Sequence, residues 1–190
     1  MAKIVVSDNV SLDGVVQDPA GDEGFERGGW VGQLKDRQEL NQLTLDEMRR
    51  ADALLLGRRS YEWFSRRWPA RTGELADRMN GLPKYVVSST LVGADWNNST
   101  VIKGDALTEV SKLKHERNGR IVVLASFQLV RLLMDHDLVD ELWLKIFPVV
   151  LGAGERLFGA TGDMRPMRLV DCQVVDASIS SVTYEAARDR

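Results

Sequence analysis

Two short apolar runs of this chain end in residue types that bind anions. The run Ala-Leu-Leu-Leu at 53–56 is followed by Gly-Arg-Arg-Ser at 57–60, and Tyr-Val-Val at 85–87 is followed by Ser-Ser-Thr at 88–90. The N–H groups at the start of a helix and the fork of an arginine both favour negative charge. Two such strand ends in one sheet can hold a doubly charged phosphate, which points to an enzyme with a nucleotide cofactor.

Strands and helices alternate until about residue 135, and strands dominate after it. The apolar runs predict strands within 3–10 and at 53–56, 84–88, 100–102, 120–124, 140–150, 168–176 and 178–186. Helical periodicity and end signals predict helices at 33–51, 60–67, 74–80, 106–117 and 127–135. Residues 17–32 are rich in glycine and acids, which predicts a mobile loop. The order predicts an α/β protein with a mainly parallel central sheet and an antiparallel C-terminal hairpin.

The composition is that of an ordinary globular protein and limits the classes of function. With 190 residues, we expect a single domain spanning 1–190. The 25 basic and 28 acidic residues give a net charge of −3, so nothing suggests a basic tract for nucleic acid. The single Cys172 fits a reducing cytosol, and the sequence shows neither a signal peptide nor a long apolar stretch. We therefore expect a cytoplasmic protein with no nucleic-acid or membrane partner.

Five segments occur in an order that resembles a known family. They are Ser-Leu-Asp-Gly at 11–14, Leu-Leu-Gly-Arg-Arg-Ser-Tyr-Glu at 55–62, Lys-Tyr-Val-Val-Ser at 84–88, Leu-Val-Asp-Glu-Leu at 138–142 and Pro-Val-Val-Leu-Gly at 148–152. Together they resemble the dihydrofolate-reductase-like family that includes the C-terminal reductase domain of the riboflavin-biosynthesis deaminase-reductase. The similarity covers nearly the whole chain. It implies a three-layer dihydrofolate-reductase-like fold that binds NADPH.

The resemblance also implies roles for individual residues. It places Arg58 at the 2′-phosphate of the cofactor, Ser60 on the diphosphate side, and the serines at 88–89 at the adenosine phosphate end. It places Asn9 and Val16 beside the nicotinamide, where the predicted loop begins. The residues implied for the cofactor are Asn9, Val16, Gly57, Arg58, Arg59, Ser60, Ser88, Ser89, Ala125, Ser126, Phe127 and Leu129.

Two positions depart from the family pattern. Ala125, Ser126 and Phe127 stand where the fold usually carries a glycine pair that cradles the diphosphate. The first two are small and a helix still begins here, so the resemblance still implies a diphosphate site. Counting back from Gly57 without gaps, Asn41 stands where dihydrofolate reductases carry a carboxylate. Without that acid, folate is not expected to be the natural substrate.

Several of these residues also have purely structural interpretations. Arg58 and Arg59 can be solvated charges at a helix start. The serines at 60, 88 and 126 can be caps of helices or turns, and Leu129 has the spacing of a core residue. The sequence leaves both interpretations open.

The candidates for the substrate side are equally open. Asp13 is a good turn residue before a glycine, and the resemblance places it near the substrate pocket. The proton for the reaction would come from water or from a nearby acid such as Asp13. Trp30 can anchor the loop or wall the site, and Phe64 can face the core or the mouth of the pocket. Lys145 shares a strand face with two aromatic side chains, so its charge either reaches the sheet rim or a substrate. With Asn41, these are the substrate-site candidates.

The expected function is an NADPH-dependent reductase that transfers a hydride to a C=N or C=O group of a small heterocycle other than dihydrofolate. Hydride transfer needs no nucleophile, which fits the scarcity of His and Cys, and neither His115 nor His136 has a partner at ligand spacing for a metal. The alternatives are a nucleotide-binding module without turnover and a purely structural dimer. A homodimer is expected because the strand at 142–150 and the late hairpin offer a second apolar surface.

Overall fold

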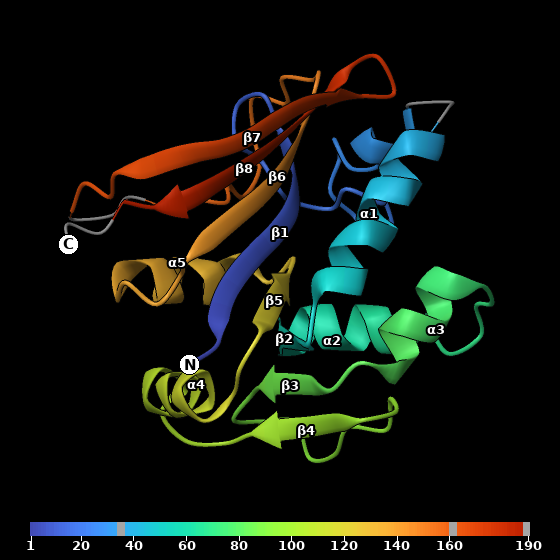
Figure 1. The fold of residues 1–190 in the computed structure, drawn as a ribbon. Helices are drawn as coiled ribbons and strands as arrows, with labels where there is room; N and C mark the ends of the chain where they lie inside the picture. The colour runs from blue at the N-terminus through green and yellow to red at the C-terminus, as the bar shows by residue number, and fades with distance from the viewer. Residues whose placement is uncertain (34–36, 160–162, 188–190) are drawn as a thin grey trace.

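The computed structural model describes residues 1–33, 37–159 and 163–187, which form an eight-stranded sheet with helices on both faces (Figure 1). The strand order is β4-β3-β2-β5-β1-β6-β8-β7. Strands β1 to β6 run parallel to one another, and β8 pairs antiparallel with β6 and β7. The strands are β1 Lys3–Ser11, β2 Ala53–Gly57, β3 Lys84–Val87, β4 Ser99–Ile102, β5 Arg120–Leu124, β6 Glu141–Phe147, β7 Met167–Val175 and β8 Ile179–Ala186. The predicted fold class is confirmed.

The helices complete three layers because alternate side chains of each strand face opposite cores. In β1, Val6 joins the core beneath α4 and α5, while Val5 joins the core beneath α1, α2 and α3. The five helices are α1 Gln38–Arg50, α2 Arg58–Ser65, α3 Glu74–Gly81, α4 Ala106–Glu116 and α5 Phe127–Asp135. Within 1–33, 37–159 and 163–187, no helix has the length and apolar character needed to cross a membrane.

Most predicted elements are present, but some ends differ. The helix predicted over 33–51 begins at Gln38, and Trp30–Gln33 forms a separate 3-10 helix, η1. Leu34, which contributed to the predicted periodicity, lies outside the described residues. Helix α2 begins two residues earlier than predicted, at Arg58, so both arginines of the Gly-Arg-Arg turn belong to its first turn.

Strand β6 differs from the prediction in length and in position. It ends at Phe147 rather than at residue 150, because Pro148 has no N–H to donate to a neighbouring strand. It lies inside the sheet between β1 and β8, and its side chains are buried, so it offers no outer surface for a homodimer. The edge strand β7, at the top of Figure 1, does expose apolar side chains: Leu169, Val170 and Val174. The homodimer stays a prediction, now resting on β7 alone.

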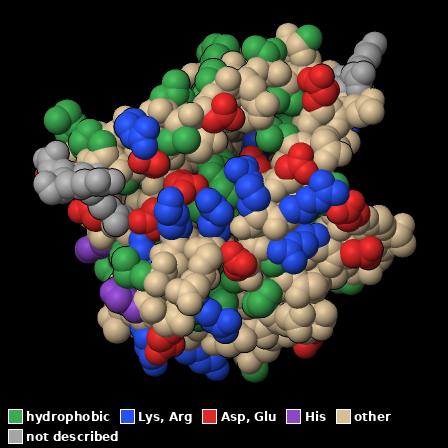
Figure 2. Space-filling model, in the orientation of Figure 1, with side chains coloured by type: hydrophobic (Ala, Val, Ile, Leu, Met, Phe, Trp, Pro, Cys, Tyr) green, Lys and Arg blue, Asp and Glu red, His purple; other side chains and the backbone are tan. Residues whose placement is uncertain are grey.

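The parallel pairing aligns the carboxyl ends of four strands along one edge of the sheet. Gly57 at the end of β2 pairs with Val87 at the end of β3, and Ser7 in β1 pairs with Leu124 at the end of β5. The residues that follow these ends are therefore neighbours in space, although they are far apart in the chain. Ligands of open α/β sheets bind at this edge. The face of the molecule seen in Figure 2 carries Lys and Arg side chains interspersed with Asp and Glu.

A fully buried cation fixes the start of β3. The Nζ atom of Lys84 donates hydrogen bonds to the backbone carbonyls of Asn80 at 3.0 Å, Leu82 at 2.8 Å and Asn97 at 2.9 Å. It also lies 4.3 Å from the ring centroid of Trp96. The lysine therefore satisfies carbonyls at the end of α3 and in the segment before β4, and holds these segments together.

We predict that Lys84→Met lowers the free energy of unfolding by about 3 kcal/mol or more, because three buried carbonyls lose a charged donor. Urea unfolding of the two proteins measures the loss. Lys112→Met, at an exposed position of α4, is the matched control and should change stability by less than about 0.5 kcal/mol. A loss at Lys84 as small as in the control would mean that water replaces the lysine at these carbonyls.

Candidate active site

Two clefts meet at the carboxyl edge of the sheet. We call the first the arginine cleft, because Arg58 and Arg59 line it; its volume is about 540 Å³. We call the second the tryptophan cleft, because Trp63 and Trp68 line it; its volume is about 500 Å³. Both clefts share the side chains that form their junction: Asp8, Asp18, Pro19, Glu23, Ser60 and Ala125. A ligand in one cleft would therefore lie directly against a ligand in the other.

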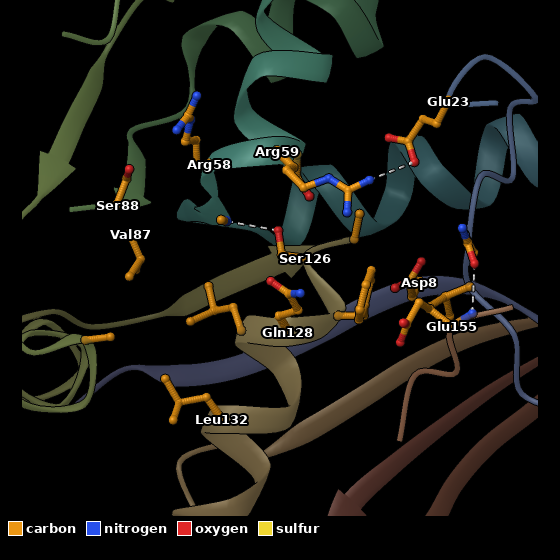
Figure 3. Close-up of a pocket in the computed structure, with 18 of the residues that line it drawn as sticks. Asp8, Glu23, Arg58, Arg59, Val87, Ser88, Ser126, Gln128, Leu132 and Glu155 are labelled. Atoms are coloured by element: carbon orange, nitrogen blue, oxygen red, sulfur yellow. Dashed lines mark hydrogen bonds and ion pairs between the residues drawn. The ribbon is translucent and has the colours of Figure 1, made fainter. Parts of the chain in front are cut away.

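The arginine cleft runs between the first turns of two helices, as Figure 3 shows. Helix α2 begins behind Gly57, and α5 begins behind Ser126. In the figure, Ser88 lies at one end of the cleft and Asp8 at the other. Each helix start presents N–H groups without intrahelical partners and a partial positive charge. The cleft therefore has the electrostatics of an anion site along its length.

The turn before α5 has the backbone of a glycine pair without the glycines. Ala125 and Ser126 both have positive φ, at 50° and 62°. This left-handed conformation costs a residue with a Cβ about 1–2 kcal/mol, and strain of this kind is concentrated at functional sites. The fold thus preserves the conformation that the family pattern implies at these positions. The residue types alone did not reveal it.

The two arginines of the cleft have partners that hold them in place. Arg58 donates from Nε to Glu62 at 2.8 Å and from Nη1 to the hydroxyl of Thr90 at 2.8 Å, and its Nη2 takes no part in either contact. Arg59 forms an ion pair with Glu23 at 3.7 Å, drawn in Figure 3. Both side chains are at least half exposed, so these ion pairs are weak and open to exchange with a charged ligand.

Two of the serine hydroxyls have structural partners, and that of Ser88 caps a turn as the structural interpretation predicted, whereas that of Ser126 does not cap α5. The Oγ of Ser88 accepts hydrogen bonds from the N–H groups of Thr90 and Leu91, at 3.2 and 3.0 Å. The Oγ of Ser126 accepts from the N–H of Gly57 at 3.0 Å and donates to the carbonyl of Leu124 at 3.0 Å. These two hydroxyls shape the cleft, while Ser60 and Ser89 line it.

The predicted loop at 17–32 is internally hydrogen-bonded. The carboxylate of Asp18 accepts four backbone N–H groups, from Gly21, Asp22 and Glu23 to Oδ1 and from Phe25 to Oδ2. The loop is also tied to α2. There, Trp63 donates its Nε1 hydrogen to Asp22 at 2.9 Å, and Arg67 contacts the same carboxylate.

A buried ionic cluster lies beneath the tryptophan cleft. Lys145 on β6 donates hydrogen bonds to Glu47 on α1 at 2.9 Å and to the hydroxyl of Ser7 at 2.7 Å, and Ser7 donates to Glu47 at 2.7 Å. The side chains of Lys145 and Glu47 are only 5% and 3% exposed, so their charges neutralise one another out of contact with water. Lys145 lines the cleft, but its ammonium faces this carboxylate and not the sheet rim.

Asp8 is the carboxylate at the junction of the two clefts. It lies on β1 and is 8% exposed. Its Oδ1 accepts the N–H of Asn9 at 2.9 Å, and its Oδ2 has no hydrogen-bond partner among the described residues. Burial raises the pKa of Asp8 from 3.8 to about 7, against the opposing effect of the Lys145 charge. At neutral pH this carboxyl can therefore exist in both protonation states.

The structure brings most of the predicted site residues together. The arginine cleft is lined by eleven residues of the predicted set, namely Val16, Gly57, Arg58, Arg59, Ser60, Ser88, Ser89, Ala125, Ser126, Phe127 and Leu129. The tryptophan cleft is lined by Asn9, Phe64 and Lys145. Leu129 is also buried in the core, as its structural interpretation predicted. Their roles toward a ligand stay predictions.

Asp13 lies elsewhere, and its geometry disagrees with the predicted role of proton donor. Its carboxylate accepts hydrogen bonds from the hydroxyl of Ser11 at 2.7 Å and from the N–H groups of Leu151 at 3.0 Å and Gly152 at 2.8 Å. These hydrogen bonds, led by that of Ser11, lower the pKa of Asp13 to about 2. The carboxyl is ionised at neutral pH, and its hydrogen bonds hold the loop after β6 in place. Asp13 thus has a structural role, which is its alternative interpretation as a turn residue.

Trp30 and Asn41 also lie apart from the clefts. Trp30 is 1% exposed, packs edge-on against Phe147 at 5.4 Å between ring centroids and donates to the carbonyl of Gln17. It is the loop anchor of the structural interpretation. Asn41 lies on the exposed side of α1, whereas Thr44 and Met48 of the same helix line the tryptophan cleft. The ungapped count back from Gly57 therefore selected a residue of α1 that lines neither cleft.

Sequence reasoning missed two carboxylates: Asp8, at the junction of the clefts, and Glu47, beneath the tryptophan cleft. Both carried a signal, because each is an acid within an otherwise apolar pattern: Asp8 follows Ile-Val-Val-Ser in β1, and Glu47 precedes Met48 on the buried side of α1. An acid at such a position is rare without a partner or a function. Among the described residues, no three His, Cys, Asp or Glu side chains gather in a way that could hold a metal ion.

The chain is a RibD C-terminal domain-type protein with a dihydrofolate-reductase-like fold. The family model of the RibD C-terminal domain matches residues 2–180, so the chain belongs to this family. It is 28% identical over 144 residues to the uncharacterized protein YyaP of Bacillus subtilis, covering 73% of this chain and 76% of that protein.

Solved structures share the fold at low sequence identity. A putative riboflavin biosynthesis protein from Shewanella sp. PV-4 has a TM-score of 0.77 and 22% identity, covering 99% of this chain and 100% of the other. Dihydrofolate reductase from Enterococcus faecalis, solved with NADP(H) and RAB-propyl, has a TM-score of 0.63 and 15% identity, covering 98% and 97% of the two chains. The dihydrofolate-reductase-like fold expected from the sequence is confirmed.

We predict that Asp8 makes stability depend on pH between about 4 and 7. The unfolded chain releases this proton near pH 4 and the folded protein near pH 7, so the folded state binds more protons between these values. The free energy of unfolding should therefore fall as the pH rises through this window, by about 1 kcal/mol or more. Asp8→Asn should remove this fall.

Urea unfolding at a series of pH values measures the effect as the difference between the wild type and the variant. Asp46→Asn, an exposed position on α1, is the control and should keep the wild-type slope. If Asp8→Asn has the same slope as the wild type across this range, the carboxyl titrates at an ordinary pKa.

Proposed function

We propose that this protein is an NADPH-dependent reductase that transfers a hydride to a C=N or C=O group of a small, flat heterocycle. One observation carries the proposal. A cleft with two helix N-termini and two arginines opens at Asp8 and Ala125 directly into a second cleft with aromatic walls. This arrangement suits a phosphate-rich cofactor lying end to end with a planar substrate. Membership of the RibD C-terminal family supports an NADPH-linked reductase in general terms.

The residues of the arginine cleft suit NADPH. The turn at Ala125 and Ser126 leads into α5 and would hold the diphosphate with backbone N–H groups. Arg58, with Nη2 still available beside its contacts to Glu62 and Thr90, would hold the 2′-phosphate. When bound, the cofactor would supply the hydride, and the protein would align it with the acceptor.

The tryptophan cleft suits a flat, uncharged ring better than a protonated pterin. Its walls include Trp63, Phe64 and Met79, which favour planar apolar surface. The carboxylate of Glu47 lies beneath the cleft but is neutralised by Lys145, so it adds no net charge to attract a cation. Folate is therefore still disfavoured, although the argument from Asn41 no longer applies.

A nucleotide-binding module without turnover is the alternative. NADPH oxidation measured with a panel of pterins, quinones and ribosylaminopyrimidines separates the two. The reductase proposal expects at least one acceptor in the panel to be reduced, and dihydrofolate to be reduced poorly. Tight NADPH binding without oxidation across the whole panel would favour the binding module.

Arg58→Ala is expected to weaken NADPH binding by about 1.5–3 kcal/mol, the range for a hydrogen bond to a charged group, and NADH binding much less. Fluorescence titration of both cofactors with both proteins measures the difference. Arg66→Ala, at an exposed position just after α2, is the control and should leave both affinities unchanged. Equal losses for NADPH and NADH would remove Arg58 from the 2′-phosphate.

The turn before α5 gives a paired prediction. Ala125→Asp should weaken NADPH and NADH alike by at least tenfold, about 1.4 kcal/mol, because a carboxylate would repel the diphosphate. Ala125→Gly should keep both affinities, because glycine adopts the positive φ of 50° found here without strain. The same titrations decide. If Ala125→Asp folds and binds both cofactors normally, the diphosphate lies elsewhere.

A further inference from the structure

The two clefts contain five lining carboxylates, and four of them are committed to other groups. Asp18 accepts four backbone N–H groups, and Asp22 accepts from Trp63 and Arg67. Glu23 and Glu155 are paired with arginines. The oxygens of these four carboxylates are therefore already engaged in hydrogen bonds or ion pairs.

Asp8 is the fifth lining carboxylate, and it differs from the other four in its hydrogen bonds. It lies at the junction of both clefts, where a reduced nicotinamide and an acceptor would meet. Its Oδ1 already accepts the N–H of Asn9, while Oδ2 is shielded from water and has no partner among the described residues. A buried carboxylate oxygen that accepts no hydrogen bond is far less favourable when it carries a negative charge than when it carries a proton. Oδ2 is thus the atom that would carry a proton.

We propose that Asp8 is the catalytic acid of the reductase: its carboxyl group turns about the Cβ–Cγ bond when an acceptor occupies the junction, so that the proton on Oδ2 reaches the nitrogen or oxygen of the acceptor. This inference rests on the proposed function. As a hydride adds to the carbon of a neutral C=N group, the π electrons of that bond form a new N–H bond with the Asp8 proton. The carbon gains a C–H bond, the acceptor is reduced to an amine, the nicotinamide is oxidised, and Asp8 is left as a carboxylate. After the product leaves, water re-protonates the carboxylate at the junction before Oδ2 turns back to its shielded position.

Charged groups around Asp8 suit this role. Lys145 on β6 is the cation whose charge reaches it, and that charge is largely balanced by Glu47 on α1. The lysine therefore lowers the pKa of Asp8 by less than burial raises it. Only the part of the lysine charge that Glu47 leaves unbalanced would stabilise the carboxylate that forms in the step.

The test compares two acceptors that differ in their need for a proton. 3,4-Dihydroisoquinoline, above its own pKa, is a neutral imine and must be protonated during reduction, whereas its N-methyl iminium cation accepts a hydride without a proton. Asp8→Asn should lower kcat/KM for the neutral imine by about 100-fold or more, the range for a general acid. It should lower kcat/KM for the iminium cation by less than about threefold. Asp46→Asn is the matched control and should change neither.

Two measurements keep the outcomes distinct. NADPH titration of Asp8→Asn should give the wild-type affinity, which shows a folded cofactor site. In the wild type, a solvent deuterium isotope effect should accompany reduction of the neutral imine and be absent for the cation, which tests the inference even if the variant does not fold. Equal losses for both acceptors, or no loss for either, would overturn the role of Asp8 and leave the reductase standing. NADPH binding without oxidation by either of these acceptors or by any member of the panel described above would instead contradict the proposed function, and the inference with it.

Discussion

The hydroxyl of Ser126 holds the arginine cleft in shape. It accepts the N–H of Gly57 and donates to the carbonyl of Leu124, so it links the end of β2 to the end of β5. Helices α2 and α5 begin directly behind these two strand ends, and the hydroxyl therefore sets the spacing of their N-termini. Two anion-favouring ends held at a fixed separation form a site for an extended ligand, which neither end would form alone.

The second constraint is electrostatic and concerns the base of the tryptophan cleft. Three polar side chains, Ser7, Glu47 and Lys145, satisfy one another almost completely out of contact with water. A buried group that pairs in this way fixes α1 against β1 and β6, and it contributes little net charge to the cleft. Asp8, one residue along β1, points to the opposite side of the strand and has no such partner. One step of strand alternation therefore separates Ser7, which joins the buried cluster, from Asp8, which does not.

The sequence predicted the order and type of nearly every element, because strands and helices of this chain have strong hydrophobic periodicity. The ends were less predictable. Helix α1 begins at Gln38, and β6 ends at Phe147, where a proline removes the next N–H. The resemblance selected cofactor candidates that the structure gathers mostly in one cleft, because most of them follow strand ends whose positions are clear in the sequence. It located the substrate residues poorly: Asn41, Trp30 and Asp13 all lie apart from the clefts.

The chain's sequence alone determined which strand ends carry glycine, arginine and hydroxyl groups, and hence which edge of the sheet would attract an anion. That follows from local chemistry, since a strand end and the helix behind it are adjacent in the chain. Only the tertiary structure decided which of the five carboxylates that line the clefts have partners at both oxygens or in ion pairs, and that the Oδ2 of Asp8 has none among the described residues. Glu47 and Lys145 are 98 residues apart, and the environment of Asp8 depends on strands, loops and helices from several parts of the chain. Burial and partnership set a carboxyl's pKa, and both are properties of the folded chain.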